Sequence, residues 1–91
     1  MEFEWDADKA TENERKHGIS FDEAATTFGD PLSLTIPDPD HSGDEERFIL
    51  LGQSYAGRRI VVVHTEGRDR IRIISARLAT GRERRSYEEE A

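Results

Sequence analysis

The fold of this chain is decided by the stretch RIRIISARLATGRERRSYEEE, residues 70–90. Arg and Ile alternate at its start, as they do in a strand with one buried and one solvated face. Further on, Thr80 and Glu83 have the spacing of a capping box, in which each side chain accepts a hydrogen bond from the other residue's backbone N–H. The stretch therefore predicts a strand over residues 70–76 that leads into a C-terminal helix.

Together with this stretch, the pattern from residue 47 onward is that of a β-meander. Residues 60–63, IVVV, are apolar on both faces and predict a central strand. The turns at residues 55–57 and 66–69 are short, so the strands that they join must be antiparallel neighbours. A loop rich in proline and aspartate is expected over residues 37–44. Strands are expected at residues 2–5, 32–36, 47–54, 58–65 and 70–76.

Two helices are expected near the N-terminus. Asp6 or Asp8 begins the first helix, which ends before Gly18 because glycine suits a left-handed stop. A second capping box, SFDE at residues 20–23, opens a short helix. The expected fold is therefore of the α+β class, with an N-terminal helical hairpin, an antiparallel sheet of three to four strands and a C-terminal helix, in one domain over residues 1–91.

Arginine is concentrated at the C-terminal end of an otherwise acidic chain. The formal net charge of −7 argues against nonspecific binding of nucleic acid by the whole surface. Residues 1–57 carry four basic and fourteen acidic side chains, whereas residues 58–91 carry nine basic and six acidic ones. Six arginines and one acid fall between Arg70 and Arg85. This local excess predicts a site for anionic groups, with RNA phosphate as the leading candidate.

The composition excludes several kinds of protein and site. Cysteine is absent, so there is no disulfide framework and no thiolate metal site, and a reducing cytoplasm is the expected location. No apolar run reaches the roughly 18 residues of a membrane span, and no signal-peptide pattern opens the chain. The acids around His41, from Asp38 to Asp44, do not have the spacing of a calcium loop. We expect no metal and no cofactor.

Four arginines are candidates for phosphate contacts. Arg70 and Arg72 share one strand face about 6.8 Å apart, and a guanidinium group binds phosphate through two parallel hydrogen bonds. The sequence is equally compatible with arginines that pair with acids on a solvated face. Arg77 stands near a helix start, where positive charge gains nothing from the helix dipole, and this favours a phosphate contact. Arg47 follows three acids and either pairs with them or binds phosphate.

Three histidines and one tyrosine are candidates for proton transfer near neutral pH. His17 ends a helix, where it also suits capping of the last carbonyls. His64 lies within a strand, where a lone histidine is more often packed than catalytic, and His41 in the acidic loop also suits solvent exposure. Tyr87 either stacks on a base and donates a proton, or pins the last helix to the sheet; physical grounds slightly favour the second role.

Several motifs occur here in a definite order: FEWD followed by Lys9 and Asn13, then KHGISFDEAATTF, PDPDHS, EERF, VVVHTE, RIRIISAR and ERRSY. Together they resemble the BrnT family of bacterial toxins, over nearly the whole chain. RIISAR followed by the arginine-rich helix is the most specific part, and KHG with the capped SFDEA helix is the next.

The resemblance implies a ribonuclease toxin of a type II toxin–antitoxin pair, with a fold related to the RelE toxins. It also implies an antitoxin similar to BrnA, a ribbon-helix-helix DNA-binding protein, so that the toxin meets DNA only through its partner in a toxin–antitoxin hetero-oligomer. RelE-like enzymes cleave RNA without metal: the ribose 2′-hydroxyl attacks the adjacent phosphate while basic side chains stabilise the developing charge. By resemblance, the catalytic positions are Arg72 and Arg77, then Arg47 and Tyr87, with His17 and His64 as acid–base candidates. Candidates for RNA binding are Lys16, Arg70, Arg84 and Arg85.

Arg72 and Arg77 can act on the same phosphate group only if their side chains lie on the same face of the sheet. Their separation is odd, so in an ideal strand the two side chains point to opposite faces. A β-bulge, or a strand that ends before Arg77, is required to bring them together. The predicted sheet also has no lysine, whereas RelE relies on sheet lysines, and the general base is therefore unassigned.

A hypothesis of another class is a protein-binding module with a decayed active site, which serves as corepressor for a DNA-binding partner. The acidic N-terminal part would suit a basic partner segment. Toxicity on expression without the partner distinguishes this module from an active ribonuclease.

Overall fold

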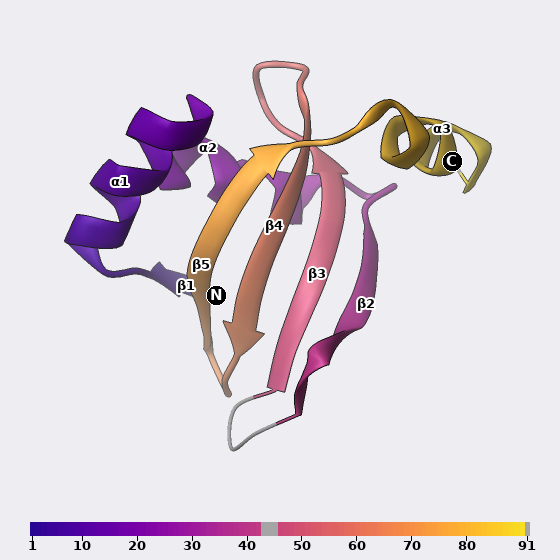
Figure 1. Ribbon diagram of the computed structural model, residues 1–91. Helices are drawn as coiled ribbons and strands as arrows, with labels where there is room; N and C mark the ends of the chain where they lie inside the picture. Colours follow the sequence, from indigo (N-terminus) through magenta and orange to yellow (C-terminus); the bar gives the residue numbers. More distant parts are fainter. Residues whose placement is uncertain (43–45, 91) are drawn as a thin grey trace.

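A mixed five-stranded sheet in the order β1–β5–β4–β3–β2 forms the centre of the molecule (Figure 1). The computed structural model describes residues 1–42 and 46–90, with the side chains of all of these except residues 41 and 42. The elements are β1 (Glu2–Glu4), α1 (Ala7–His17), α2 (Phe21–Thr26), the 3₁₀ helix η1 (Thr27–Gly29), β2 (Leu34–Ser42), β3 (Glu46–Gln53), β4 (Arg59–Glu66), β5 (Arg70–Leu78) and α3 (Gly81–Glu90).

The predicted meander is confirmed, and the prediction for the N-terminal part needs correction. Strands β3, β4 and β5 pair as antiparallel neighbours, and β4 is the middle strand, as its apolar run predicts. The sheet has five strands and not the three to four predicted, because both β1 and β2 join the meander as edge strands, and it is not wholly antiparallel, because β1 pairs with β5 in parallel. Nor do the first helices form a separate hairpin: the chain opens with a strand, and α1 and α2 both pack against β5. Their apolar residues are buried by the sheet, which is why they lie on it.

The ends of the helices follow the expected chemistry. The Asp6 carboxylate accepts hydrogen bonds from the N–H groups of Asp8 and Lys9 at 2.9 and 3.0 Å, and α1 ends at Gly18 with φ of 71°. The Thr80–Glu83 capping box is reciprocal, with distances of 3.2 and 2.8 Å. None of the helices in the described part of the chain is long and apolar enough to cross a membrane.

The core lies between the sheet and the first two helices. We call this side of the sheet the covered face, and in Figure 1 it is turned away from the viewer, with α2 behind the strands. Phe21 packs edge-on against Trp5, with ring centroids 5.9 Å apart. The buried residues of this cluster are Ile19, Phe21, Ala24, Ile60, Val62, Ile71, Ile73 and Ala76.

Strand β2 extends further than the sequence predicts. The loop expected from residue 37 is part of the strand up to Ser42, although its pairing with β3 is irregular between Pro37 and Ser42. Proline is tolerated here because β2 is an edge strand, whose outer N–H groups need no partner in the sheet. The side chain of His41 and all of Asp44, considered above as metal ligands, lie outside the described residues.

A β-bulge divides strand β5 into two parts. Ser75 lies opposite Val63, but Ile73 lies opposite His64, so one extra residue, Ile74, is inserted in β5. The bulge therefore resets the alternation of side chains along the strand. Before it, Ile71 and Ile73 point to the covered face; after it, Ala76 does so.

Candidate functional site

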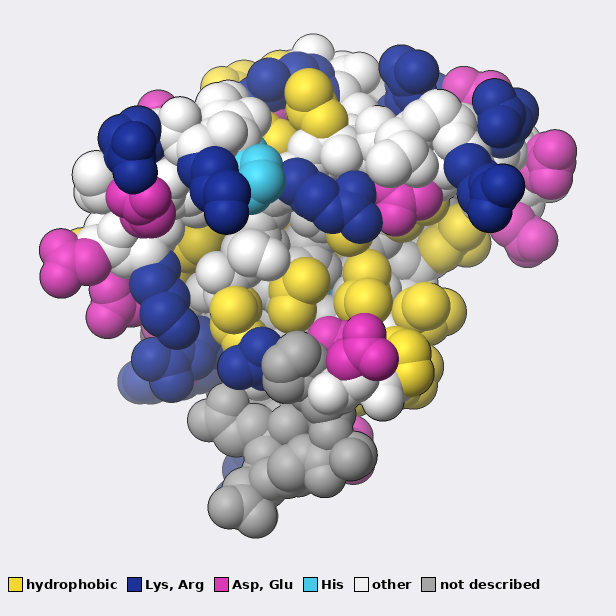
Figure 2. All heavy atoms as spheres, viewed as in Figure 1, with side chains coloured by type: hydrophobic (Ala, Val, Ile, Leu, Met, Phe, Trp, Pro, Cys, Tyr) yellow, Lys and Arg dark blue, Asp and Glu magenta, His cyan; other side chains and the backbone are white. Residues whose placement is uncertain are grey.

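The other side of the sheet, which we call the open face, carries side chains from all four long strands. Cross-strand partners share a face, so the pairing places the open-face residues in rows. The first row is Arg72, Thr65 and Arg47; the second is Ser75, Val63, Ile49 and Ile36; the third is Arg77, Val61, Leu51 and Leu34. Figure 2 shows this face, with hydrophobic side chains gathered over its middle and basic side chains beside and above them.

The bulge thus meets the geometric condition for Arg72 and Arg77. Both are on the open face, although their separation in the sequence is odd. The structure also brings Arg47 to this face, in the same row as Arg72. With strands about 4.8 Å apart, the backbones of Arg47 and Arg72 are separated by about 10 Å, with Thr65 between them.

The first row is available to an anion. The guanidinium groups of Arg47 and Arg72 have no hydrogen-bond or ion-pair partner among the residues that the structure describes. Arg72 also lines a hollow of about 680 Å³ with Thr65, Arg68 and Arg70, and the acidic residues Glu4, Glu46, Glu66 and Asp69 line it as well. Arg70 differs, because its guanidinium lies 3.6 Å from a Glu2 carboxylate oxygen and 3.5 Å from one of Glu4. The alternative of pairing with acids therefore applies to Arg70.

Arg77 has a structural partner, contrary to the expectation from the helix dipole. Its two terminal nitrogens donate to the two carboxylate oxygens of Glu83 at 2.8 and 2.9 Å. The hydrogen bonds from Arg77 lower the pKa of Glu83 to about 2, and the backbone N–H of Thr80 adds to this effect. The sequence argument considered the dipole alone and overlooked the capping carboxylate, which brings a negative charge to the same place; a phosphate contact by Arg77 stays a prediction.

A second group of basic residues lies at the edge of β5. Lys9, Lys16 and His17 of α1 line a hollow of about 230 Å³ together with Glu12, Asn13, Ile74 and Ser75. Ser75 belongs to the open face as well, so this basic corner adjoins the rows described above. The bulge residue Ile74 and the end of α1 therefore meet, and this contact brings the predicted residues Lys16 and His17 next to the arginine strand.

Sequence reasoning gave Lys9 and Asn13 no role in the site beyond their place among the family motifs, although their spacing contains the signal. Positions 9, 12, 13, 16 and 17 repeat at three and four residues, so they lie on one side of an α-helix. A helical reading of residues 7–17 therefore groups Lys9 with Lys16 and His17. What no periodicity shows is that this side of the helix meets the bulge of β5.

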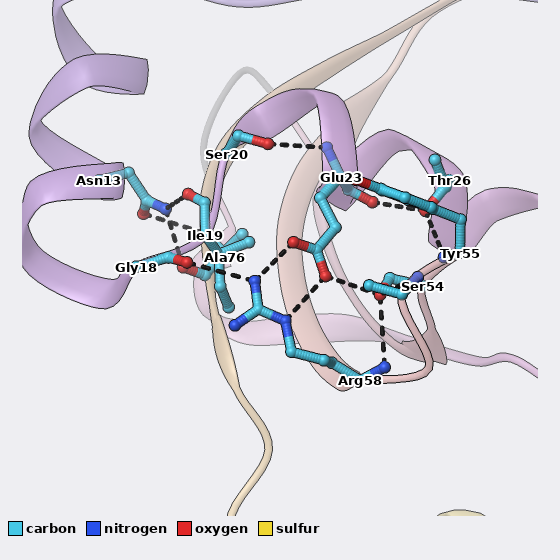
Figure 3. Close-up of polar contacts among 11 residues, drawn as sticks. Asn13, Gly18, Ile19, Ser20, Glu23, Thr26, Ser54, Tyr55, Arg58 and Ala76 are labelled. Carbon is cyan, nitrogen blue, oxygen red and sulfur yellow. Dashed lines mark hydrogen bonds and ion pairs between the residues drawn. The ribbon is translucent and has the colours of Figure 1, made fainter.

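Asn13 fixes the edge of β5 where β1 ends. Strand β1 pairs only with residues 70–72, so the backbone of Ala76 lacks a neighbouring strand. Asn13 substitutes for one: its amide nitrogen donates to the carbonyl of Ala76 at 2.9 Å, and the N–H of Ala76 donates to its amide oxygen at 3.1 Å (Figure 3). The same amide nitrogen also donates to the carbonyl of Ile19 at 3.1 Å. The buried amide of Asn13 thereby holds α1 against the strand directly after the bulge.

His64 lies on the opposite side of the sheet from the arginines. Its side chain is fully buried on the covered face, with the rings of Phe28 and Phe48 at centroid distances of 4.8 and 5.8 Å. Its Nε2 atom lies 2.9 Å from a carboxylate oxygen of Glu66. The structure therefore does not bring His64 together with Arg72, and its position is the packed one that the sequence also allowed.

Tyr87 is likewise engaged in packing. Its side chain is buried, its hydroxyl donates to Asp30 at 2.6 Å, and the guanidinium of Arg59 lies 5.2 Å from the ring centre. The hydrogen bond to Asp30 raises the pKa of Tyr87. Arg84 and Arg85 remain exposed on α3, and Arg84 lines a separate hollow beside Arg59. Tyr87 thus anchors α3, as the packing alternative expects.

A buried polar cluster at the end of the sheet has a structural role (Figure 3). The Glu23 carboxylate accepts hydrogen bonds from Arg58 Nε at 2.9 Å and from the Ser54 hydroxyl at 2.7 Å. These bonds, that from Arg58 above all, lower the pKa of Glu23. Arg58 also donates to the carbonyl of Gly18 at 3.2 Å. Only half of the second capping box therefore forms: Ser20 accepts from the N–H of Glu23, but the carboxylate binds Arg58 instead. The cluster ties α2 to the β3–β4 turn.

Within the described residues, no group of three or more His, Cys, Asp or Glu side chains is arranged to hold a metal ion. The fold and this face define a small α+β protein in which basic residues gather on one side of a sheet and at its edge. Such an arrangement suits the binding of a phosphate backbone.

Comparison with known proteins identifies the family. Residues 5–83 match the family model described as "Ribonuclease toxin, BrnT, of type II toxin-antitoxin system". The chain therefore belongs to the BrnT family of ribonuclease toxins, as its motifs suggested. The crystal structure of the ribonuclease toxin BrnT from Brucella abortus is similar, with a TM-score of 0.64 and 23% sequence identity over 88% of this chain and 97% of that one. A search of curated proteins found no match.

The family membership implies an RNA substrate and an antitoxin partner. At 23% identity, the Brucella abortus structure establishes a shared fold alone. The relation to RelE toxins stays a prediction, as do the roles of individual residues.

Proposed function

We propose that this chain is a metal-independent endoribonuclease that binds RNA on the open face and is neutralised in the cytoplasm by a BrnA-like ribbon-helix-helix antitoxin. Contact with DNA is then indirect, through the antitoxin in a hetero-oligomer. The observation that carries the proposal is the row Arg72–Thr65–Arg47, in which two arginines without described partners flank a small polar residue on a bare sheet face.

The reaction that suits this row is transesterification of the RNA backbone. The 2′-oxygen attacks the adjacent phosphorus, its proton passes to a base, the bond from phosphorus to the 5′-oxygen breaks, and that oxygen takes up a proton. Negative charge builds on the non-bridging phosphate oxygens, and fixed guanidinium groups that face them stabilise it. Arg72 and Arg47 are the residues to which we assign this role.

His17 is the residue to which we assign proton transfer. It is the described histidine that lies beside the arginine strand, since His64 is on the covered face. Lys9 and Lys16 line the same hollow and would hold the RNA backbone there. Arg77 contributes differently: its pairing with Glu83 fixes the strand–helix turn, while its partly exposed guanidinium remains within reach of a second phosphate.

The test is cleavage of a defined single-stranded RNA by the purified chain in excess EDTA. We expect Arg72→Ala to lower the cleavage rate by about 100-fold or more, the usual cost of losing one charge-stabilising group. Arg70→Ala is the matched control, because Arg70 is on the same strand and is already held near Glu2 and Glu4. Equal activity of the two variants would refute the assignment to Arg72. Loss of wild-type cleavage in EDTA that added metal restores would refute metal independence, and absence of cleavage both alone and with ribosomes would favour the binding-module hypothesis.

A further inference from the structure

The aliphatic part of the open face is a surface feature that the proposed reaction leaves unused. Ile36 is 56% exposed, and its neighbours in the rows are partly exposed. We call this set the aliphatic patch; it consists of Leu34, Ile36, Ile49, Leu51 and Val63. The patch lies between the basic row of Arg47 and Arg72 and the strand ends where α3 begins (Figure 2). A contiguous exposed group of this kind marks an interaction site more often than chance.

The chemistry of the patch selects protein over RNA. Unpaired bases are bound by stacking on aromatic rings or on guanidinium planes. All five members of the patch are Leu, Ile or Val, and the phenylalanine of β3, Phe48, points to the covered face against His64. An aliphatic surface recognises aliphatic side chains, whereas the arginines at its border recognise carboxylates.

The edges of the sheet do not favour addition of a strand from a partner. On one side, β1 and the amide of Asn13 already occupy the edge of β5. On the other side, Pro37 and Pro39 in β2 lack backbone donors, which weakens pairing with any further strand. A partner is therefore better accommodated by the face than by the edges.

The dimensions of the patch suit one α-helix. Strands β4, β3 and β2 span about 10 Å from first to last, and a helix with its side chains is about 10–12 Å wide. From Arg47 to Gln53, strand β3 extends about 20 Å, the length of roughly 13 helical residues. One helix of the same molecule already packs at the far end of this face, where Tyr87 of α3 lies against Arg59.

We infer that the aliphatic patch binds an amphipathic helix of the antitoxin, with Leu, Ile or Val on its buried side and Glu or Asp flanking them to pair with Arg47 and Arg72. This inference rests on the proposed function, because the helix blocks RNA by occupying the arginines of the first row. Inhibition is then steric and electrostatic at once, and the same arginines that bind phosphate hold the antitoxin.

The experiment measures the affinity of the purified full-length chain for its cognate antitoxin by calorimetry. Ile36→Asp places a charge in the patch at an exposed position, and we expect it to weaken binding by at least about 30-fold, the effect typical of a central interface residue. Leu78→Asp is the matched control: Leu78 is 50% exposed, and its partner Ile60 shows that it lies on the other side of the sheet. RNA cleavage by the Ile36→Asp chain should remain and should resist added antitoxin.

Three results would overturn the inference. The first is equal antitoxin affinity of the two variants. The second is loss of RNA binding by Ile36→Asp with normal antitoxin affinity, which would show that the patch binds RNA. The third is a wild-type chain that dimerises in solution when Ile36→Asp does not, which would show that the patch binds a second copy of this chain. Calorimetry does not depend on catalysis. If the wild-type chain fails to cleave RNA while Ile36→Asp still weakens antitoxin binding as expected, the proposed ribonuclease activity is refuted and the docking surface is supported.

Discussion

The two faces of the sheet have opposite chemistry, although the same strands form both. On the covered face and at its margins, polar groups are engaged within the fold: Glu23 binds Arg58, Asn13 binds Ala76, and His64 contacts Glu66 through Nε2, although its buried Nδ1 has no hydrogen-bond partner among the described residues. On the open face, Arg47 and Arg72 have no described partner and Ile36 is exposed. Burial on the first face favours stability, whereas the groups on the second face gain most when a ligand covers them. Changes to the engaged groups should therefore affect folding, and changes to the unpartnered side chains of the open face or to the basic residues at its edge should affect function.

The largest expected effect separates the two histidines. His17→Ala should lower RNA cleavage by about 100-fold or more, because a positioned acid or base typically contributes that much. His64→Leu should leave the rate unchanged, since His64 is buried on the covered face. Cleavage rates of the two proteins at equal folded concentration test this. If His64→Leu alone lost cleavage rate, proton transfer would belong to the covered face and not to the edge of the open face.

The next effect concerns the buried carboxylate. Glu23→Gln should lower the free energy of unfolding by about 1.5–3 kcal/mol, the usual contribution of hydrogen bonds to a charged group. Glu12→Gln serves as control, because the Glu12–Arg15 pair is exposed and such pairs contribute less than about 1 kcal/mol. Urea unfolding gives both values. If Glu23→Gln also abolished cleavage by the folded protein, the cluster would have more than a structural role.

A smaller effect is expected at the strand–helix turn. The pKa of Glu83 is about 2 in the folded protein, below its ordinary value of 4.5. A depressed carboxyl pKa stabilises the fold fully above pH 4.5, and this stabilisation is lost as the pH falls through about 2. Glu83→Gln should therefore lower the unfolding free energy by about 1–2 kcal/mol at pH 7, with a smaller difference near pH 2. A difference that does not depend on pH would show that the Arg77 pairing is not its source.

The smallest effect is expected for the tyrosine of α3. Tyr87→Phe removes the hydrogen bond to Asp30 but keeps the ring under Arg59, so it should cost about 1 kcal/mol of stability. The cleavage rate should stay within a factor of two. Thermal unfolding and the RNA assay measure the two quantities. A large loss of rate with unchanged stability would instead make Tyr87 a proton donor.

Much of the local chemistry was predictable from the sequence where the partners are near in the chain, although the Ser20–Glu23 capping box forms only by half. The capping box of Thr80 and Glu83, the left-handed stop at Gly18 and the apolar run of β4 each depend on residues within a few positions. From these features the meander, the C-terminal helix and the arginine strand could be predicted. The family motifs, which extend over most of the chain, gave the class of protein.

The tertiary structure alone decided which residues share a face and which have partners. The bulge at Ile74 puts Arg72 and Arg77 on one side, the register of β3 adds Arg47, and the contact of α1 with β5 adds His17. The parallel pairing of β1 was equally out of reach, because it joins residues nearly 70 positions apart. Strand alternation and helix periodicity are local, whereas register and contacts between distant elements are fixed by how the whole chain buries its apolar surface.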